Sequence, residues 1–224
     1  VLNNPLDEVI SGEIQCRGLG MAVDVFDEEG NSVTDTPGEL VCTKPFPSMP
    51  IMFWNDPDGK KYQEAYFDYY PNVWRHGDWT KLTKRGTLII FGRSDATLNP
   101  GGVRIGTAEI YKVVESFEQI IESIVIGQKW EDDIRIVLFV KLIEKVSLDE
   151  KLKTEIKNKL RQLVSPRHVP AKIISVADIP RTRSGKITEL AVRDVIHGKK
   201  IKNIEALSNP EALDLFKDLA ELNN

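Results

Sequence analysis

Three short segments of this sequence combine residue types that can bind phosphate or ribose. The segment 180–186, PRTRSGK, carries three cations, two hydroxyls and a glycine between a predicted strand and a predicted helix. Such groups can surround anionic oxygens. The segment is not a Walker A loop, because that motif needs glycine where Pro180 stands and a hydroxyl where Ile187 stands. An anion-binding loop and a solvated basic turn are both open interpretations.

The second segment, 92–106, reads GRSDATLNPGGVRIG and runs directly into a helix predicted from Thr107. Its glycines allow the backbone to approach a ligand closely, and Arg93 and Arg104 can each donate paired hydrogen bonds to phosphate or ribose oxygens. The N-terminus of the following helix also favours an anion. The spacing is not GxGxxG, so there is no dinucleotide fingerprint, and a tight turn explains the composition equally well.

The third segment, 74–79, reads WRHGDW and places Asp78 beside a glycine between aromatic residues. An aspartate in this position can accept two hydrogen bonds from a vicinal diol such as ribose. The alternative is an Asx-turn that joins two strands. Both interpretations require the neighbouring strands to hold the carboxylate.

Residues 1–94 are predicted to form mostly strands, because short β-prone runs alternate with turn residues. A turn is predicted at 27–31, and the proline-rich stretch 45–59 is predicted to be an irregular surface loop. The predicted strands are 13–16, 22–26, 39–42 and 87–91.

After residue 95 the pattern changes to alternating helices and strands. A helix is predicted from a cap at Thr107 through Phe117, and the apolar run 134–143 is typical of a strand covered on both faces. Three further elements are predicted: a helix from the capping box 147–150 up to Pro166, a strand at 171–177 and a final helix from Asn209. The fold class is therefore α/β (α+β), with a β-rich part at 1–94 and a small mixed α/β domain at 95–224, in which helices flank a few-stranded sheet.

Composition narrows the class of partner. The 224 residues are 41% hydrophobic and 29% charged, as in soluble globular proteins. The net charge of -4 gives no long-range attraction for nucleic acid or for an anionic membrane, so neither partner is expected. The two cysteines form no CxxC motif and suit a reducing compartment, and the three histidines are too scattered to predict a metal site.

The three segments occur in the order and approximate separations found in the adenylate-forming enzymes, which include acyl-CoA synthetases, peptide-synthetase adenylation domains and luciferases. The chain resembles this superfamily over nearly its whole length, and residues 37–41, PGELV, are similar to a further motif of it. Within the superfamily, the stretches 14–21, 53–59, 74–78, 92–111 and 208–211 resemble acetoacetyl-CoA synthetases. The resemblance implies that 1–94 is the C-terminal part of a large adenylate-forming domain and that 95–224 is a mobile C-terminal domain.

The resemblance also implies a reaction, in which acetoacetate, ATP and CoA become acetoacetyl-CoA, AMP and pyrophosphate through an acyl-adenylate. Such an enzyme is expected in the cytoplasm, in ketone-body and fatty acid metabolism. The segments that hold the triphosphate, adenine and Mg²⁺ lie upstream of this region in the family. The chain opens at Val1 without an initiator methionine. We therefore expect it to be the C-terminal portion of a longer enzyme and to be inactive alone.

By similarity, Lys186 bridges carboxylate and phosphate oxygens in the adenylation step, and so is the expected catalytic residue. Asp78 matches the carboxylate that binds the ribose hydroxyls, and Arg93 matches an arginine on the ribose side of the nucleotide. Regulatory acylation of Lys186 would remove its charge. Lysine-acylating and deacylating enzymes are accordingly possible partners.

Four residues are implicated in the second step or in the change between steps. Arg104 matches an arginine near the adenylate phosphate, and Gly102 matches the glycine along which the pantetheine arm of CoA passes. Asp95 stands at the hinge of the family. Arg161 resembles an arginine that contacts the CoA 3′-phosphate, although it also suits the exposed face of a helix.

Two other functions fit the same sequence. An acetyl- or propionyl-CoA synthetase would share every superfamily motif, because the acyl pocket lies upstream. A free-standing nucleotide- or CoA-binding module is a different class, and a pure binder has no evident use for both Lys186 and a hinge at Asp95.

Overall fold

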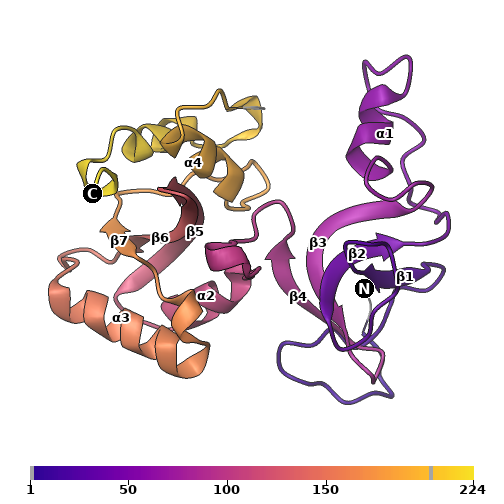
Figure 1. Cartoon of the computed structure of the whole chain (residues 1–224), viewed down its shortest axis with the longest axis horizontal. Coiled ribbons are helices and arrows are strands. Elements are labelled where there is room, and N and C mark those ends of the chain that lie inside the picture. Colours follow the sequence, from indigo (N-terminus) through magenta and orange to yellow (C-terminus); the bar gives the residue numbers. More distant parts are fainter. Residues whose placement is uncertain (1–2, 202–203) are drawn as a thin grey trace. The chain divides into compact units, whose positions relative to one another are not determined.

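The computed structural model describes residues 3–201 and 204–224. It divides into two compact units, Val1–Asp95 and Ala96–Asn224, which are described separately (Figure 1). This division falls one residue after the predicted one, and the roles of the two parts as large and mobile domains stay predictions. Each unit contains one sheet with accompanying helices, so the predicted mixed α/β class is confirmed.

The first unit is built on a four-stranded antiparallel sheet in the order β1-β2-β3-β4. Its strands are β1 (Val23–Phe26), β2 (Pro37–Cys42), β3 (Trp74–Leu82) and β4 (Leu88–Arg93). Side chains that alternate along the strands, among them Val25, Trp74 and Leu88, form the core of the unit. The register shifts within the β2/β3 pair and within the β3/β4 pair, and both shifts lie close to Asp78.

The loop between β2 and β3 carries an aromatic cluster. It is irregular over 45–59, as predicted, and is followed by a short helix α1 (Lys60–Tyr66) that was not predicted. Tyr66 of α1 stacks on Trp74 of β3, with ring centroids 3.6 Å apart. Helix α1 has seven residues, too few to show a helical period in the sequence.

The second unit contains a three-stranded sheet in the order β5-β6-β7. Strands β5 (Ile120–Trp130) and β6 (Asp133–Leu142) form a long antiparallel hairpin, and β7 (Lys172–Ser175) lies parallel to β6. Neighbouring residues of β6 enter different clusters: Leu138 faces one core and Phe139 the other. Burial of both faces explains the continuous apolar run that predicted this strand.

Helices cover both faces of this sheet (Figure 1). One face packs against α2 (Thr107–Val114) and α3 (Glu150–Leu163). The opposite face packs against α4 (Glu189–Ile196) and the C-terminal tail, residues 204–224. The short 3₁₀ helices are η1 (Pro100–Gly102), η2 (Pro166–His168), η3 (Ile204–Ala206), η4 (Pro210–Phe216) and η5 (Ala220–Leu222).

Several predicted elements differ in the structure. The strand at 13–16 is wrong: Ile14 forms a single bridge with Leu88, and the Gln15 amide turns back to the carbonyls of Asn4 and Asp7. The helix after the glycine-rich loop ends at Val114 rather than Phe117, and Thr107 is its first residue rather than its cap.

Helix α3 differs from its prediction in its cap, and the final helix differs in its type. Helix α3 is capped by Asp149, whose carboxylate accepts from the Leu152 N–H at 2.8 Å, and not by the capping box at 147–150. The final helix begins after Asn209 as predicted but is a 3₁₀ helix. Within the part of the chain that the structure describes, no helix is long and apolar enough to cross a membrane.

Candidate functional site

Asp78 and Arg93 are direct cross-strand partners in the β3/β4 pair. An Arg93 guanidinium nitrogen lies 3.6 Å from one Asp78 carboxylate oxygen, and His76 Nε2 lies 3.6 Å from the other. The Arg93 Nε also lies 3.4 Å from Asp95. The guanidinium is half exposed and the Asp78 side chain is 21% exposed, so a diol can reach the carboxylate while a cation balances its charge.

Gly77 allows this close packing. Its φ is +83°, and a Cβ built at Gly77 would lie 2.7 Å from the Arg93 Nη2 atom. Any other residue would be strained in this backbone conformation and would displace the guanidinium. The glycine beside Asp78 therefore fits both the positive φ and the nearby arginine.

Glu39 of β2 bonds to the residues next to Asp78 and Arg93. Its side chain is 5% exposed, and one carboxylate oxygen accepts from the Gly77 N–H and from the Ser94 hydroxyl, each at 2.9 Å. The other oxygen lies 3.2 Å from the Arg75 Nε. A buried carboxylate is stable only when it is paired. Glu39 is paired with Gly77, Ser94 and Arg75, and so it connects these three residues around the site. In the sequence, Glu39 belongs to the PGELV motif, whose residue types do not indicate this role.

The glycine-rich segment of the second unit is a hairpin anchored at its base. Leu98 and Ile105 are buried and exchange backbone hydrogen bonds of 2.9 and 2.8 Å. The tip between them is largely exposed, and Gly101 and Gly102 have φ values of +57° and +76°. A Cβ at Gly102 would meet nothing within 4 Å, so the tip is open at this glycine.

Asp133, at the start of β6, ties down the tip of this hairpin. Both of its carboxylate oxygens lie 3.0 Å from the Gly101 N–H. The backbone N–H of Ile134, followed by that of Gly101, holds the pKa of Asp133 below its usual value. Gly102 and Lys129 border an open hollow of about 380 Å³ beside this contact. Arg104 is exposed on the same tip.

The basic segment forms a second, tighter hairpin. Arg181 and Ile187 form an antiparallel bridge, and the Thr182 N–H donates to the Lys186 carbonyl at 2.8 Å. Gly185 takes the left-handed conformation at the turn, with φ +80°. The Lys186 side chain is exposed and makes no hydrogen bond or ion pair within residues 3–201 and 204–224. It is therefore available to a ligand.

Arg181 has a structural task in this hairpin. Its guanidinium donates to the Gly185 carbonyl across the turn and, at 2.5 Å, to Glu122 of β5. The three cations of the segment are thus not equivalent, because Arg181 braces the turn whereas Arg183 and Lys186 are exposed.

Comparisons with known proteins show what this chain is similar to. Residues 109–186 match the family of AMP-binding enzyme C-terminal domains. An acetoacetyl-coenzyme A synthetase of Rhizobium meliloti is 65% identical over 222 residues, which are 99% of this chain and 34% of that protein. The Xenopus tropicalis acetoacetyl-CoA synthetase is 49% identical over 96% of this chain and 32% of its own length.

Among solved structures, the acetoacetyl-CoA synthetase from Streptomyces lividans superposes with a TM-score of 0.88. It is 45% identical and covers 95% of this chain, which in turn covers 32% of that protein. The resemblance to acetoacetyl-CoA synthetases is confirmed, and the chain spans about a third of the length of these relatives. Both the glycine-rich tip and Arg104 lie outside the matched stretch 109–186, whereas Lys186 is its last residue.

Arg161 lies on the exposed face of α3, inside the matched stretch 109–186. Its guanidinium donates to Asn158, one turn earlier, at 3.0 Å. This is the surface position that the alternative interpretation describes, and a contact with the CoA 3′-phosphate stays a prediction.

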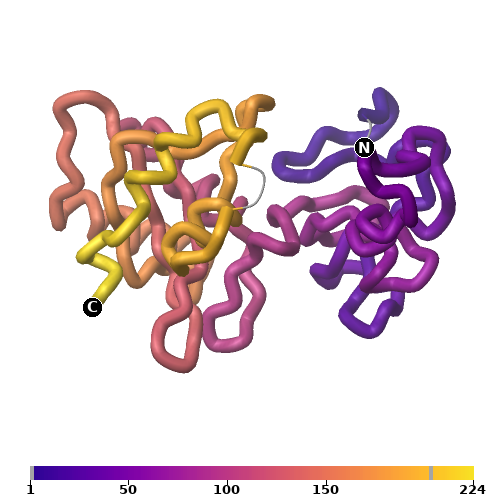
Figure 2. Tube along the Cα trace, turned by 90° about the horizontal axis from the view of Figure 1, so that it is seen from above, coloured from indigo at the N-terminus to yellow at the C-terminus, as the bar shows by residue number. Residues whose placement is uncertain are grey.

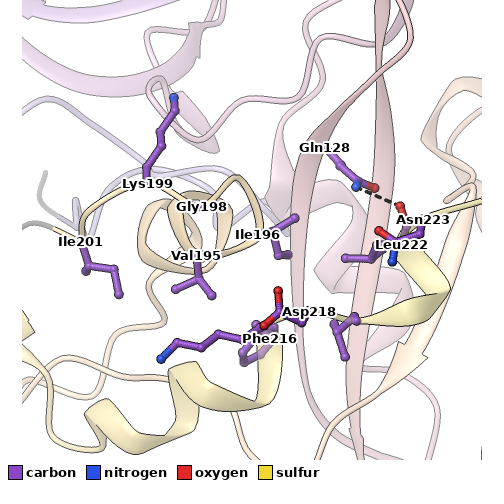
Figure 3. Close-up of a pocket in the computed structure, with 12 residues that line it drawn as sticks. Gln128, Val195, Ile196, Gly198, Lys199, Ile201, Phe216, Asp218, Leu222 and Asn223 are labelled. Atoms are coloured by element: carbon purple, nitrogen blue, oxygen red, sulfur yellow. Dashed lines mark hydrogen bonds between the residues drawn. The ribbon is translucent and has the colours of Figure 1, made fainter.

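A pocket of about 460 Å³ lies between the C-terminal end of α4 and the tail (Figure 3). Gln128 of β5 closes one side by donating to the Leu222 carbonyl at 3.3 Å, and Lys199 and Asp218 supply charges to its lining. None of the predicted site residues lines this pocket. The predicted site residues therefore lie away from this hollow.

The described residues form no metal-binding cluster and no disulfide. No group of three His, Cys, Asp or Glu side chains within 3–201 and 204–224 is placed to hold a metal ion. Cys16 and Cys42 form no disulfide with each other, and burial raises the pKa of Cys42 above its usual value.

Proposed function

We propose that this chain is part of an ATP-dependent acetoacetate–CoA ligase. The observation that carries the proposal is the 65% identity with an acetoacetyl-CoA synthetase over 99% of the chain. In the first step, a carboxylate oxygen of acetoacetate bonds to the α-phosphorus of ATP as pyrophosphate leaves. In the second, the CoA thiolate bonds to the acyl carbon and AMP leaves, so that both steps bring negative groups together.

Lys186 is the proposed catalytic residue of the first step. An exposed ammonium on a hairpin held by its own hydrogen bonds can meet the carboxylate and phosphate oxygens and stabilise the charge that develops between them. Asp78 is proposed to accept hydrogen bonds from the ribose hydroxyls, while Arg93 keeps the carboxylate oriented and faces the same side of the nucleotide.

The second step is proposed to use the glycine-rich tip. Gly102 offers backbone without a side chain beside an open hollow, which suits the passage of the pantetheine arm. Arg104 is exposed on the same tip for the adenylate phosphate, and Arg161 is a candidate for the CoA 3′-phosphate. Asp95 is the last residue of the first unit and is proposed as the hinge between the two steps.

The remaining partners are small molecules. ATP, AMP, CoA and acetoacetate are the proposed ligands, and Mg²⁺ is proposed to be held by residues outside this chain. We also propose a cytoplasmic location, which the lack of a disulfide between Cys16 and Cys42 supports. Lysine-acylating and deacylating enzymes are proposed partners at the exposed Lys186.

The proposal is tested in the complete enzyme that contains this chain. Acetoacetate should support exchange of pyrophosphate into ATP and CoA-dependent release of AMP, with a higher kcat/KM than acetate or propionate. Lys186→Ala should lower the exchange by about 10²- to 10³-fold, the scale for loss of one preorganised electrostatic group. Preference for acetate or propionate would identify the alternative ligase, and absence of AMP release with all three acids would contradict the ligase function.

A further inference from the structure

The hairpin that presents Lys186 is held on one side by the C-terminal tail, which lies outside the matched stretch 109–186. The Arg183 N–H donates to the Ala206 carbonyl at 3.0 Å, and the Ser208 N–H donates to the Arg181 carbonyl at 2.8 Å. Between these bonds, Thr182 and Leu207 form an antiparallel bridge. The tail therefore adds a short strand to the hairpin, and Figure 2 shows the yellow tail beside the orange segment that contains it.

The side chain of Asn209 in the tail bonds to the residues at the start of the hairpin. The Asn209 amide nitrogen donates to Asp178 Oδ2 at 2.7 Å and to the Ile179 carbonyl at 3.0 Å. The Asn209 amide oxygen accepts from the Arg181 N–H at 2.7 Å. Both amide hydrogens and the oxygen are thus engaged with the residues on which the hairpin begins.

Only an amide of this length satisfies all three contacts. An aspartate would place a second carboxylate against Asp178 and could not donate to the Ile179 carbonyl. A leucine would fill the same space but remove all three hydrogen bonds, which costs stability when the bonded groups are partly buried. Asp178 is itself fixed by Lys141 of β6 at 2.7 Å, so Asn209 connects the hairpin to the sheet.

The hairpin depends on such contacts because its tip is exposed. Arg183, Ser184, Gly185 and Lys186 are all solvent-exposed, and no apolar side chain among these four anchors the turn. Preorganised charge stabilises a transition state only when its position is already determined, and a displacement of about 1 Å can lower a rate by about 10²-fold. The hydrogen bonds from the tail therefore help to fix the position of Lys186.

We infer that Asn209 is a positioning residue for the adenylation step, acting through the hairpin that presents Lys186. This inference rests on the proposed function of Lys186. Asn209 touches no reacting atom, so it acts by ordering residues 179–183 on which the hairpin stands. The tail thus contributes to the first half-reaction and is not needed to order the glycine-rich tip proposed for the second.

The test compares Asn209→Leu and Asn209→Ala with Lys186→Ala in the complete enzyme. Adenylation, followed by acetoacetate-dependent pyrophosphate exchange, should fall by about 10- to 100-fold in both Asn209 variants. Thioester formation from supplied acetoacetyl-adenylate should stay at the parent level. Amide hydrogen exchange at Arg181, whose N–H bonds to Asn209, should become faster. Asn223→Ala is the matched control, since it removes the same side chain from the same tail away from the hairpin.

The outcomes separate this inference from the proposed function. Unchanged adenylation in the Asn209 variants, or equal loss in both half-reactions with a lowered unfolding midpoint, would overturn the positioning role alone. Unchanged adenylation in Lys186→Ala would overturn the proposed role of the lysine and, with it, this inference. A selective loss of adenylation, accompanied by faster exchange at Arg181, would support it.

Discussion

Tyr111 of α2 and Glu189 of α4 share a hydrogen bond of 3.0 Å between the tyrosine hydroxyl and the Glu189 carboxylate. The same hydroxyl accepts from the Val125 N–H of β5 at 3.2 Å. Burial raises the pKa of Tyr111 well above its usual range, and the nearby Glu189 carboxylate raises it further. Helix α2 follows the glycine-rich hairpin in the chain, and α4 follows the Lys186 hairpin. The Tyr111–Glu189 hydrogen bond therefore connects the two helices that follow these hairpins.

Tyr111→Phe is expected to destabilise the chain by about 1–3 kcal/mol, because it leaves the Glu189 carboxylate and the Val125 N–H without the hydroxyl. Chemical denaturation followed by tryptophan fluorescence or circular dichroism would measure the change. Tyr69→Phe is a suitable control, since Tyr69 is half exposed and lies in the first unit. Equal stability of Tyr111→Phe and the parent would show that the hydroxyl bridge contributes nothing.

The sequence predicted the elements and loops whose cause is local. The strand at β6 is recognisable because both of its faces are buried. Glycines and cations at short spacing predicted a turn or an anion-binding loop at each of the two segments that form hairpins in the structure. Strand β5 was missed because polar residues such as Glu122 and Lys129 interrupt its apolar pattern. In the sheet, β5 is the edge strand that pairs with β6.

The supporting residues of the candidate site were missed for another reason. Glu39 meets Gly77 and Ser94 across three strands, and Asn209 meets Arg181 across 28 residues of chain. A side chain that bonds to distant backbone groups leaves no period or spacing in the sequence. A buried acidic residue in an apolar strand was the available indication for Glu39, and for Asn209 there was only a helix-start pattern.

A second prediction concerns Gly77→Ala in the complete enzyme. The new Cβ would lie 2.7 Å from Arg93 Nη2, so the guanidinium must shift, and we expect its contact with Asp78 to weaken. We expect the KM for ATP to rise by about tenfold, which corresponds to about 1.4 kcal/mol of lost binding. Gly86→Ala is the matched control, because Gly86 has nearly the same φ, +82°, with no atom within 4 Å of its Cβ position. Equal rises in KM would assign the effect to backbone strain rather than to Arg93.

A third prediction concerns acid stability. The hydrogen bond from Lys141, followed by that from Asn209, lowers the pKa of Asp178 below its ordinary value of 3.8, although burial opposes the shift. A carboxyl group with a depressed folded-state pKa stabilises the fold above its unfolded pKa and loses this contribution as pH falls through the folded pKa. Stability from Asp178 should therefore be complete above about pH 4 and decline below it.

Asp178→Asn tests this pH dependence in the 224-residue chain. The variant should be less stable than the parent near neutral pH, because Lys141 loses its charged partner. Its free energy of unfolding should then fall less steeply than that of the parent as the pH drops below about 4. Parallel curves for the two proteins in urea titrations across this range would contradict a contribution from Asp178.

The last prediction separates the two hairpins through Asp133. Asp133→Ala removes both carboxylate contacts to the Gly101 N–H and should loosen the tip that presents Gly102. In the complete enzyme, thioester formation from supplied acetoacetyl-adenylate should fall by about tenfold, since a misplacement of about 1 Å costs up to about 10²-fold. Adenylation should be retained, because the Lys186 hairpin is held by separate hydrogen bonds.

Asp132→Ala is the matched variant for this experiment. It removes a carboxylate from the same exposed turn without touching Gly101, so it reports the effect of charge alone on the approach of the anionic CoA. The difference between the two variants then measures the contact to the tip. If Asp133→Ala and Asp132→Ala changed thioester formation equally, charge and not the position of Gly102 would explain the result. If Asp133→Ala instead lowered adenylation, the proposal that the Lys186 hairpin serves adenylation and the glycine-rich hairpin serves thioester formation would be wrong.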